Sequence, residues 1–232
     1  MKKNVIVGQS GGPTAVINAS LAGVYKTAKD MGADTIYGMR YGIQGLLEKK
    51  IVDLGEKIRN DMDVELLKRT PASFLGSCRY KLPEISEDKA IYEKIFAILE
   101  ELEIMAFFYI GGNDSMDTIK KLSDYAETVG NPIRFIGVPK TIDNDLPCTE
   151  RTFGFDTAMA MATEALDRLH TTAESHHRVM VLEVMGRYAG WIALHSGIAG
   201  GADVILLPEI PYKLEPVIAK IQARKAAGKN FS

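Results

Sequence analysis

Hydrophobic residues are arranged along the chain in two alternating ways. Short apolar runs bounded by glycine or polar turns alternate with longer stretches in which apolar residues recur at helical spacing. The short runs predict strands at residues 4–7, 35–39, 105–110, 134–138, 179–184 and 204–207. The longer stretches predict helices at residues 14–31, 88–103, 115–128, 157–173, 188–199 and 213–227. Because alternating strands and helices are typical of βαβ units, the expected fold class is α/β with a mainly parallel sheet.

Residues 139–153 interrupt this alternation. The segment contains two prolines, many polar residues and no helical period, so it is expected to be a long functional loop between two lobes. We place the boundary near residue 145, which gives an N-terminal lobe of residues 1–145 and a second lobe of residues 146–232. The last predicted helix should lead into another parallel strand, so the second lobe is expected to be incomplete in this chain.

Composition narrows the class of protein. With 46% apolar and 25% charged residues, the chain resembles an ordinary globular protein. Its net charge of -2 gives no sign of the broad basic surface that a nucleic-acid-binding protein needs. No apolar run reaches about 18 residues, so we expect no membrane partner and a cytoplasmic location. Cys78 and Cys148 lie far apart without CxxC spacing, which fits reduced thiols better than a disulfide or a zinc site.

The end of the first predicted strand carries a glycine-rich turn. In open α/β sheets, ligands collect at the carboxyl ends of the strands. In the segment 8–14, Gly11 and Gly12 let the backbone approach an anion, and the following helix N-terminus offers N–H groups. The segment is neither a Walker A loop nor a GxGxxG fingerprint. On this motif alone, a phosphate site and an ordinary strand-to-helix turn are equally good interpretations.

A second glycine pair follows the strand predicted at 105–110. Gly111 and Gly112 leave room for a phosphate, and the next three residues can cap a helix or hold a hydrated Mg²⁺. Those three residues are Asn113, Asp114 and Ser115. A helix cap explains one polar residue but not the two glycines before it, so a phosphate or metal role is favoured.

Two further strand ends add charged residues. Lys140 supplies a compact positive charge suited to a phosphate. Asp143 and Asp145 stand two positions apart, so both can project from an extended loop toward one cavity, one as a base and the other facing a metal. After the strand predicted at 179–184, Arg187 can bind a substrate phosphate. Together, the four strand ends predict phosphoryl transfer by positioning and charge neutralisation.

The order and spacing of these motifs resemble the 6-phosphofructokinase family. The resemblance is carried by residues 10–12, 74–79, 111–115, 139–145, 176–178, 185–187 and 199–201. It implies the fold of that family, with two Rossmann-like lobes. Arg178 resembles the arginine that reaches into a neighbouring subunit's site, which implies a homodimer or homotetramer.

The resemblance also implies roles for individual residues. Asp143 would take the proton from the sugar's 1-hydroxyl, with Lys140 and Arg187 as the other catalytic residues. The implied sugar-phosphate contacts are Thr141, Ile142, Asp143, Arg178, Met185, Gly186 and Arg187. The implied donor contacts are Gly11, Gly12, Arg79, Asp114, Ser115 and Lys140. Mg²⁺ is the implied cofactor, facing Asn113 and Asp145. Most members have an aspartate in place of Asn113, so a contact there would be weakened or water-mediated.

Two positions bear on the phosphoryl donor. Members that use ATP resemble Gly-Gly-Asp-Gly-Ser and Pro-Gly-Thr-Ile-Asp-Asn-Asp, whereas this chain has Asp114 and Lys140 in place of glycines. Asp114 would repel the α-phosphate of a nucleotide and fill its space, while Lys140 can neutralise the terminal phosphate of a smaller donor. The resemblance is therefore to the diphosphate-dependent type, with diphosphate and fructose 6-phosphate as substrates.

Three alternatives remain open from the sequence. The chain could belong to an ATP-dependent phosphofructokinase, or to a kinase of another sugar phosphate such as sedoheptulose 7-phosphate. It could also be a non-catalytic subunit that binds sugar phosphates and regulates a partner. The intact Asp143 disfavours that last alternative, because a protein that only binds has no need of a base.

Overall fold

The computed structural model describes residues 3–232. The chain divides into two compact units, Met1–Lys140 and Thr141–Ser232. The division therefore falls a few residues before the boundary expected near residue 145. None of the helices in residues 3–232 combines the length and the apolar composition of a membrane-spanning segment.

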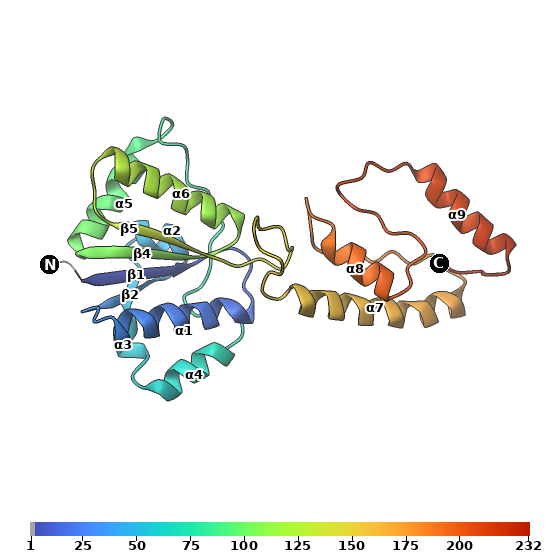
Figure 1. Cartoon of the computed structure of the whole chain (residues 1–232), viewed down its shortest axis with the longest axis horizontal. Coiled ribbons are helices and arrows are strands. Elements are labelled where there is room, and N and C mark those ends of the chain that lie inside the picture. The colour runs from blue at the N-terminus through green and yellow to red at the C-terminus, as the bar shows by residue number, and fades with distance from the viewer. Residues whose placement is uncertain (1–2) are drawn as a thin grey trace. The chain divides into compact units, whose positions relative to one another are not determined.

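The first unit is built on one five-stranded sheet with the strand order β3-β2-β1-β4-β5 (Figure 1). The strands are β1 Asn4–Gln9, β2 Ile36–Met39, β3 Ile51–Asp53, β4 Ile104–Gly111 and β5 Arg134–Pro139. The pairs β1–β2, β1–β4 and β4–β5 are parallel, and β3 is an antiparallel edge strand. The mainly parallel α/β sheet is confirmed. The sequence did not predict β3, because a three-residue strand is too short to show an alternating pattern.

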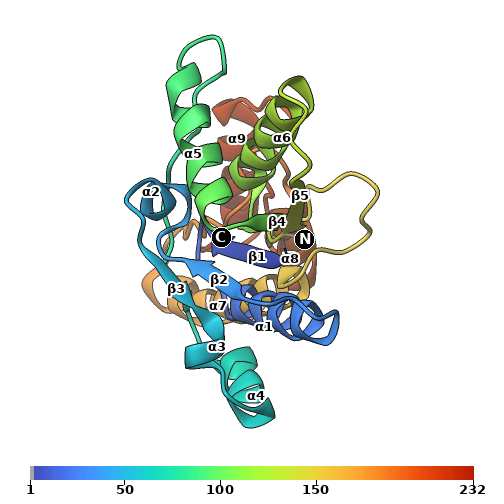
Figure 2. The ribbon, with the colours of Figure 1, turned by 90° about the vertical axis from the view of Figure 1, so that its left-hand side faces the viewer.

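Helices cover both faces of this sheet, as Figure 2 shows end-on. They are α1 Ala15–Asp30, α2 Gly42–Leu47, α3 Leu54–Lys57, α4 Asp61–Arg69, α5 Lys89–Glu101 and α6 Asn113–Thr128. Side chains alternate between the faces along each strand. In β1, Val7 packs with α1, α3 and α4, whereas Ile6 packs with α2, α5 and α6. In β4, Ile110 packs on the same face as Val7, and Phe107 packs on the same face as Ile6. Two separate hydrophobic cores therefore enclose the sheet.

The second unit contains the helices α7 Phe155–His176, α8 Trp191–Ala199 and α9 Leu214–Ala226. The prediction of strands at 179–184 and 204–207 was wrong, because neither segment belongs to a sheet. An apolar run makes a segment suitable for a sheet, but a strand also needs a hydrogen-bonded neighbour. The first segment instead meets the end of the described chain: the N–H of Met180 donates to Ser232 O at 2.9 Å, and the N–H of Ser232 donates to Arg178 O at 3.3 Å.

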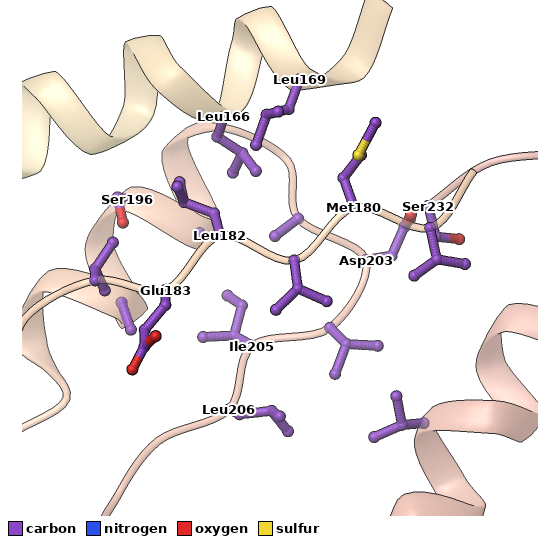
Figure 3. Close-up of a pocket in the computed structure, with 18 of the residues that line it drawn as sticks. Leu166, Leu169, Met180, Leu182, Glu183, Ser196, Asp203, Ile205, Leu206 and Ser232 are labelled. Atoms are coloured by element: carbon purple, nitrogen blue, oxygen red, sulfur yellow. The ribbon is translucent and has the colours of Figure 1, made fainter. Parts of the chain in front are cut away.

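The two extended segments line an apolar cavity of about 560 Å³ within the second unit. Figure 3 shows Leu182 and Ile205 directed into it, with Leu166 of α7 alongside. The unit buries few side chains fully, and Val181 is 86% exposed. The cavity is thus a loosely packed interior between helices and unpaired segments, and it lacks the cluster of cationic side chains that a phosphate site needs.

Candidate phosphate-binding site

Three strands of the first unit end side by side. The ladder between β1 and β4 pairs Gln9 with Ile110, and the ladder between β4 and β5 pairs Gly111 with Pro139. Backbone bonds continue the pairing beyond the strands: Ser10 N–H donates to Ile110 O at 2.9 Å, and the residue after β5 donates to Gly111 O at 2.7 Å. Because the strands are parallel, their carboxyl ends deliver three loops to one edge of the sheet.

The two glycine turns predicted from the sequence face each other at this edge. A Cβ atom on Gly11 would lie 3.8 Å from the backbone nitrogen of Gly112, and Gly11 itself has φ of 78°. Gly111 has no room for a side chain, since a Cβ there would lie 2.0 Å from Ser115 Oγ. The hydroxyl groups of Ser10 and Ser115 are hydrogen-bonded to each other and join the two turns. The turns therefore form one backbone-lined surface that a phosphate can approach closely.

Lys140 lies at this surface with 7% of its area exposed. Its ammonium group donates a hydrogen bond to the carbonyl oxygen of Gly12. Lysine is rarely buried to this extent, because removing a charge from water is costly. A compact ammonium group with three donors, held at a glycine turn, is well suited to contacting a phosphate oxygen.

The helices that follow the two turns begin without a side-chain cap. Thr14 is the N-cap residue of α1, but its side chain does not cap the helix, and the N-cap residue of α6 is Gly112, which has no side chain. The Thr14 hydroxyl oxygen is buried and has no hydrogen-bond partner among the described residues. By contrast, Asn60 and Asp88 cap α4 and α5 with their own side chains. The N-termini of α1 and α6 therefore keep N–H groups and positive dipole ends available to an anion.

Asp114 and Asn113 lie in the first turn of α6, and both are exposed. A carboxylate in the first turn interacts favourably with the helix dipole, so Asp114 stabilises α6 as well as adding negative charge beside the turn. Ser115 is buried, and its hydroxyl group is hydrogen-bonded to that of Ser10. Two predicted donor residues lie in this turn. Ser115 contacts the opposite glycine turn directly, whereas Asp114 lies at the exposed edge of the turn.

A further loop reaches the first glycine turn from between α4 and α5. The N–H of Gly11 donates to the carbonyl of Cys78 at 3.3 Å, and the hydroxyl of Ser77 donates to the carbonyl of Gly11 at 2.5 Å. These bonds place Arg79, which is exposed, one residue beyond the contact. The sequence selected Arg79 but assigned no part to Ser10 or Ser77, because a serine in a loop gives no signal until its partner is known.

The predicted catalytic loop begins the second unit and is firmly held. The N–H of Asp143 donates to the hydroxyl oxygen of Thr141 at 3.0 Å. Asn144 adopts a left-handed conformation with φ of 57°, and its side-chain oxygen accepts a hydrogen bond from the N–H of Thr152 at 2.9 Å. Asp143, Asn144 and Asp145 are all half-buried. The two aspartates are thus on an ordered loop, unlike the solvated acid pair of an ordinary turn.

The remaining predicted substrate residues lie on separate loops of the second unit. Gly186 has φ of 121°, and its neighbours Met185 and Arg187 are exposed. The guanidinium group of Arg187 lies 5.9 Å from the centroid of the Tyr188 ring. Arg178 follows the end of α7 and is also exposed. The roles given to these residues, and to half-buried Ile142, stay predictions.

A resident metal site is not formed by the described residues. Within residues 3–232, no group of three or more histidine, cysteine, aspartate or glutamate side chains could hold a metal ion. Mg²⁺ usually keeps several waters and takes one or two carboxylates together with substrate phosphates. Asp145 on its ordered loop fits such a partial role better than Asn113, whose amide oxygen is an uncharged ligand.

Comparison with known proteins gives a consistent family. The chain matches the family model named Phosphofructokinase over residues 4–232. It is 45% identical over 239 residues to an ATP-dependent 6-phosphofructokinase of Chloroflexus aggregans, covering 100% of this chain and 63% of that protein. It is 44% identical over 224 residues to a pyrophosphate–fructose 6-phosphate 1-phosphotransferase of Amycolatopsis methanolica, covering 97% of this chain and 61% of that protein.

The fold agrees with a solved structure as well. A pyrophosphate-dependent phosphofructokinase from Nitrosospira multiformis superimposes with a TM-score of 0.84 at 38% identity, covering 98% of this chain and 59% of that chain. The chain thus spans about three fifths of the length of these relatives, and their names divide between the two phosphoryl donors. With a match over nearly every residue, the chain belongs to the phosphofructokinase family.

Proposed function

We propose that this chain carries the donor site and the catalytic loop of an enzyme that transfers a phosphoryl group from diphosphate to the 1-hydroxyl of fructose 6-phosphate. Members of the family act on fructose 6-phosphate and generally use Mg²⁺ with their donor. The observation that carries the donor assignment is Lys140, buried at the glycine turn with its ammonium on the Gly12 carbonyl.

Lys140 and Asp114 act on the donor in complementary ways. An ammonium group within the glycine turn can neutralise the charge of a short donor, and it occupies volume that a glycine would leave open. The carboxylate of Asp114 stands in the first turn of α6, next to the other glycine pair. Two like charges about 4 Å apart near a protein surface repel by ~4 kcal/mol. A nucleotide phosphate led past Asp114 would meet this repulsion, which favours diphosphate over ATP.

The proposed transfer step gives each predicted catalytic residue one role. The carboxylate of Asp143 accepts the proton of the sugar's 1-hydroxyl as the hydroxyl oxygen bonds to the terminal phosphorus. The bridging P–O bond of diphosphate breaks, and the leaving phosphate is neutralised by Lys140 and Arg79. Mg²⁺, when bound, would be held by Asp145 and Asn113 together with the donor phosphates, and it would neutralise further charge on the donor. Thr141 and Arg187 hold the 6-phosphate of the sugar and orient it for the transfer.

The remaining binding roles belong to the same proposal. The backbone of Gly11 and Gly12 and the hydroxyl of Ser115 contact the donor, while Ile142, Met185 and Gly186 shape the sugar site. The step is reversible, because the donor anhydride and the product ester differ little in energy. Arg178 completes the sugar site of a neighbouring copy in a homodimer or homotetramer, and the enzyme works in the cytoplasm.

An ATP-dependent enzyme is the second candidate, because several similar relatives carry that name, the Chloroflexus protein at 45% identity among them. A coupled assay of fructose 1,6-bisphosphate formation with diphosphate or ATP separates the two. We expect faster turnover with diphosphate, and a shift toward ATP in the double variant Asp114→Gly with Lys140→Gly. Asp114→Asn is the matched control that removes the charge but keeps the volume. Equal or faster turnover with ATP in the unaltered protein would refute the donor assignment.

The acceptor and the regulatory alternative need separate measurements. Replacing fructose 6-phosphate by sedoheptulose 7-phosphate in the same assay tests the sugar. Calorimetry that shows fructose 6-phosphate binding without turnover would favour a non-catalytic subunit. Asp143→Asn should abolish turnover while leaving diphosphate binding within about twofold, because the base is not a donor contact.

A further inference from the structure

Two fully buried amide side chains lie directly behind the first glycine turn. Gln9 is the last residue of β1, and Asn18 is the fourth residue of α1. Both side chains are 0% exposed. Neither belongs to the donor or sugar contacts described above, yet a buried primary amide is costly unless its hydrogen bonds are made.

Every hydrogen-bonding position of Gln9 is occupied. Its side-chain nitrogen donates to Ile17 O at 2.9 Å and to the side-chain oxygen of Asn18 at 3.0 Å. Its side-chain oxygen accepts from the Ser73 hydroxyl at 2.7 Å and from Leu75 N–H at 2.8 Å. An amide has two donor hydrogens and two acceptor lone pairs, so Gln9 has a partner at every position, and it shares the single Ser73 hydroxyl hydrogen with the carbonyl of Gly76, which lies at 2.7 Å.

Asn18 is saturated in the same way. Its side-chain nitrogen donates to the carbonyls of Thr70 and Ala72, both at 2.9 Å. Its side-chain oxygen accepts from Phe74 N–H at 2.8 Å and from Gln9 at 3.0 Å. A single orientation of each amide satisfies this network, because exchanging oxygen and nitrogen would face donors with donors.

The shared target of both amides is the loop 70–78 between α4 and α5. The loop contains no helix or strand, and it includes the left-handed residues Ala72 and Gly76 with φ of 62° and 74°. Much of its fixed geometry thus comes from side-chain amides that take the place of a strand partner. Its far end supplies the contacts of Ser77 and Cys78 with Gly11 and leads into Arg79.

We propose that Gln9 and Asn18 are positioning residues that hold the loop 70–78 in place, so that Arg79 is preorganised for the donor phosphates. Gln9 is bonded along the chain to Ser10, so the same amide pair fixes both the glycine turn and the loop that contacts it. The proposal rests on the proposed donor site. Loosening the amide pair weakens donor binding and leaves sugar-phosphate binding unchanged, because the sugar contacts lie on other loops.

Asn18→Ala tests the proposal, with Asn4→Ala as the matched control. Asn4 lies at the opposite end of β1, where its side chain donates to Leu102 O at 2.8 Å and accepts from Thr35 N–H at 3.1 Å. Both variants lose side-chain to backbone bonds next to the same strand, but only Asn18 contacts the loop. Diphosphate binding by calorimetry and thiol labelling of Cys78 in a Cys148→Ser background are measured for each variant.

We expect Asn18→Ala to weaken diphosphate binding about tenfold or more, because several loop bonds are lost together. Labelling of Cys78, which is half-buried in the loop, should accelerate by a similar factor. Asn4→Ala should change neither diphosphate affinity nor the rate of Cys78 labelling, even if it lowers the thermal midpoint of unfolding as much as Asn18→Ala does. Ser73→Ala removes one bond to Gln9 and serves as the milder variant if Asn18→Ala does not fold; it should accelerate Cys78 labelling about threefold or more.

Two results would overturn the proposal. One is Cys78 labelling that is unchanged in Asn18→Ala and Ser73→Ala; the other is a loss of diphosphate affinity that Asn4→Ala reproduces. The labelling arm requires no donor. Failure of the unaltered protein to bind diphosphate, with labelling still accelerated, would therefore remove the proposed donor but keep the loop-holding role of the amide pair.

Discussion

Replacing Lys140 by methionine tests whether this lysine serves to bind the donor or to stabilise the fold. The substitution keeps most of the side-chain volume and removes the charge and its donors. The whole Lys140 residue is 7% exposed, and its ammonium bonds to the carbonyl of Gly12, a residue that is itself exposed. Water can therefore replace the lost donor on Gly12, and the cost of keeping a charge away from water disappears.

Stability and binding should consequently change in different ways. The free energy of unfolding of Lys140→Met should stay within about 1 kcal/mol of the unaltered protein, since water replaces the lost donor on Gly12 and the desolvation cost of the charge is relieved. Diphosphate binding should lose a charge-assisted contact of about 1.5–3 kcal/mol, which is roughly a 10- to 150-fold rise in Kd.

The assay pairs urea unfolding with calorimetric titration of diphosphate. Lys120→Met is the control, because Lys120 is an exposed lysine of α6 that forms an ion pair with Asp124 at 2.8 Å. Its substitution should leave diphosphate binding unchanged. Unaltered diphosphate affinity in Lys140→Met would show that Lys140 is not a donor contact. A loss of several kcal/mol of stability would instead show that the lysine is structural.

Three further outcomes follow from local geometry. Gly111→Ala should lower the free energy of unfolding by about 1–3 kcal/mol in thermal unfolding, because the added Cβ would lie 2.0 Å from Ser115 Oγ. The control is Gly23→Ala in α1, where an added Cβ would meet nothing within 4 Å. This control should raise the free energy of unfolding by about 0.5–1 kcal/mol. The reverse result at either glycine would contradict the packing. Burial raises the pKa of the Tyr109 phenol above its ordinary value of 10.0. The unfolded chain then loses this proton first, so stability falls as pH rises above about 10, and urea unfolding from pH 9 to 11 should show a shallower fall in Tyr109→Phe. Asn60→Ala should cost about 1 kcal/mol by uncapping α4 and leave diphosphate binding unchanged; weakened binding would link α4 to the site.

The sequence alone was sufficient for the parallel core of the first unit. The strands β1, β2, β4 and β5 were predicted with nearly their observed ends, because an apolar run bounded by turns reports burial on both faces of a sheet. The glycine turns after β1 and β4 were found for a related reason. Strand order was not needed to place them together, since all parallel strands end at the same edge.

The hydrophobic pattern of the sequence could not predict the short elements or identify the segments that stay unpaired. The region between β2 and α5 holds β3 and the helices α2, α3 and α4, most of them too short for a period to emerge. The segments 179–184 and 204–207 have the composition of strands but are not paired in a sheet. Composition reports what a segment can bury, whereas a strand is defined by a neighbour that lies elsewhere in the chain.

The candidate site was likewise predictable only in part from the sequence. Residue types and spacing selected Gly11, Gly12, Lys140 and the paired acids, because phosphate chemistry requires small residues and charge at strand ends. The contact of Lys140 with Gly12, the joined serines, and the two saturated amides came only from the tertiary structure. A hydrogen bond needs two groups at about 3 Å, and the chain brings these partners together from positions as far apart as Gly12 and Lys140 only when it folds.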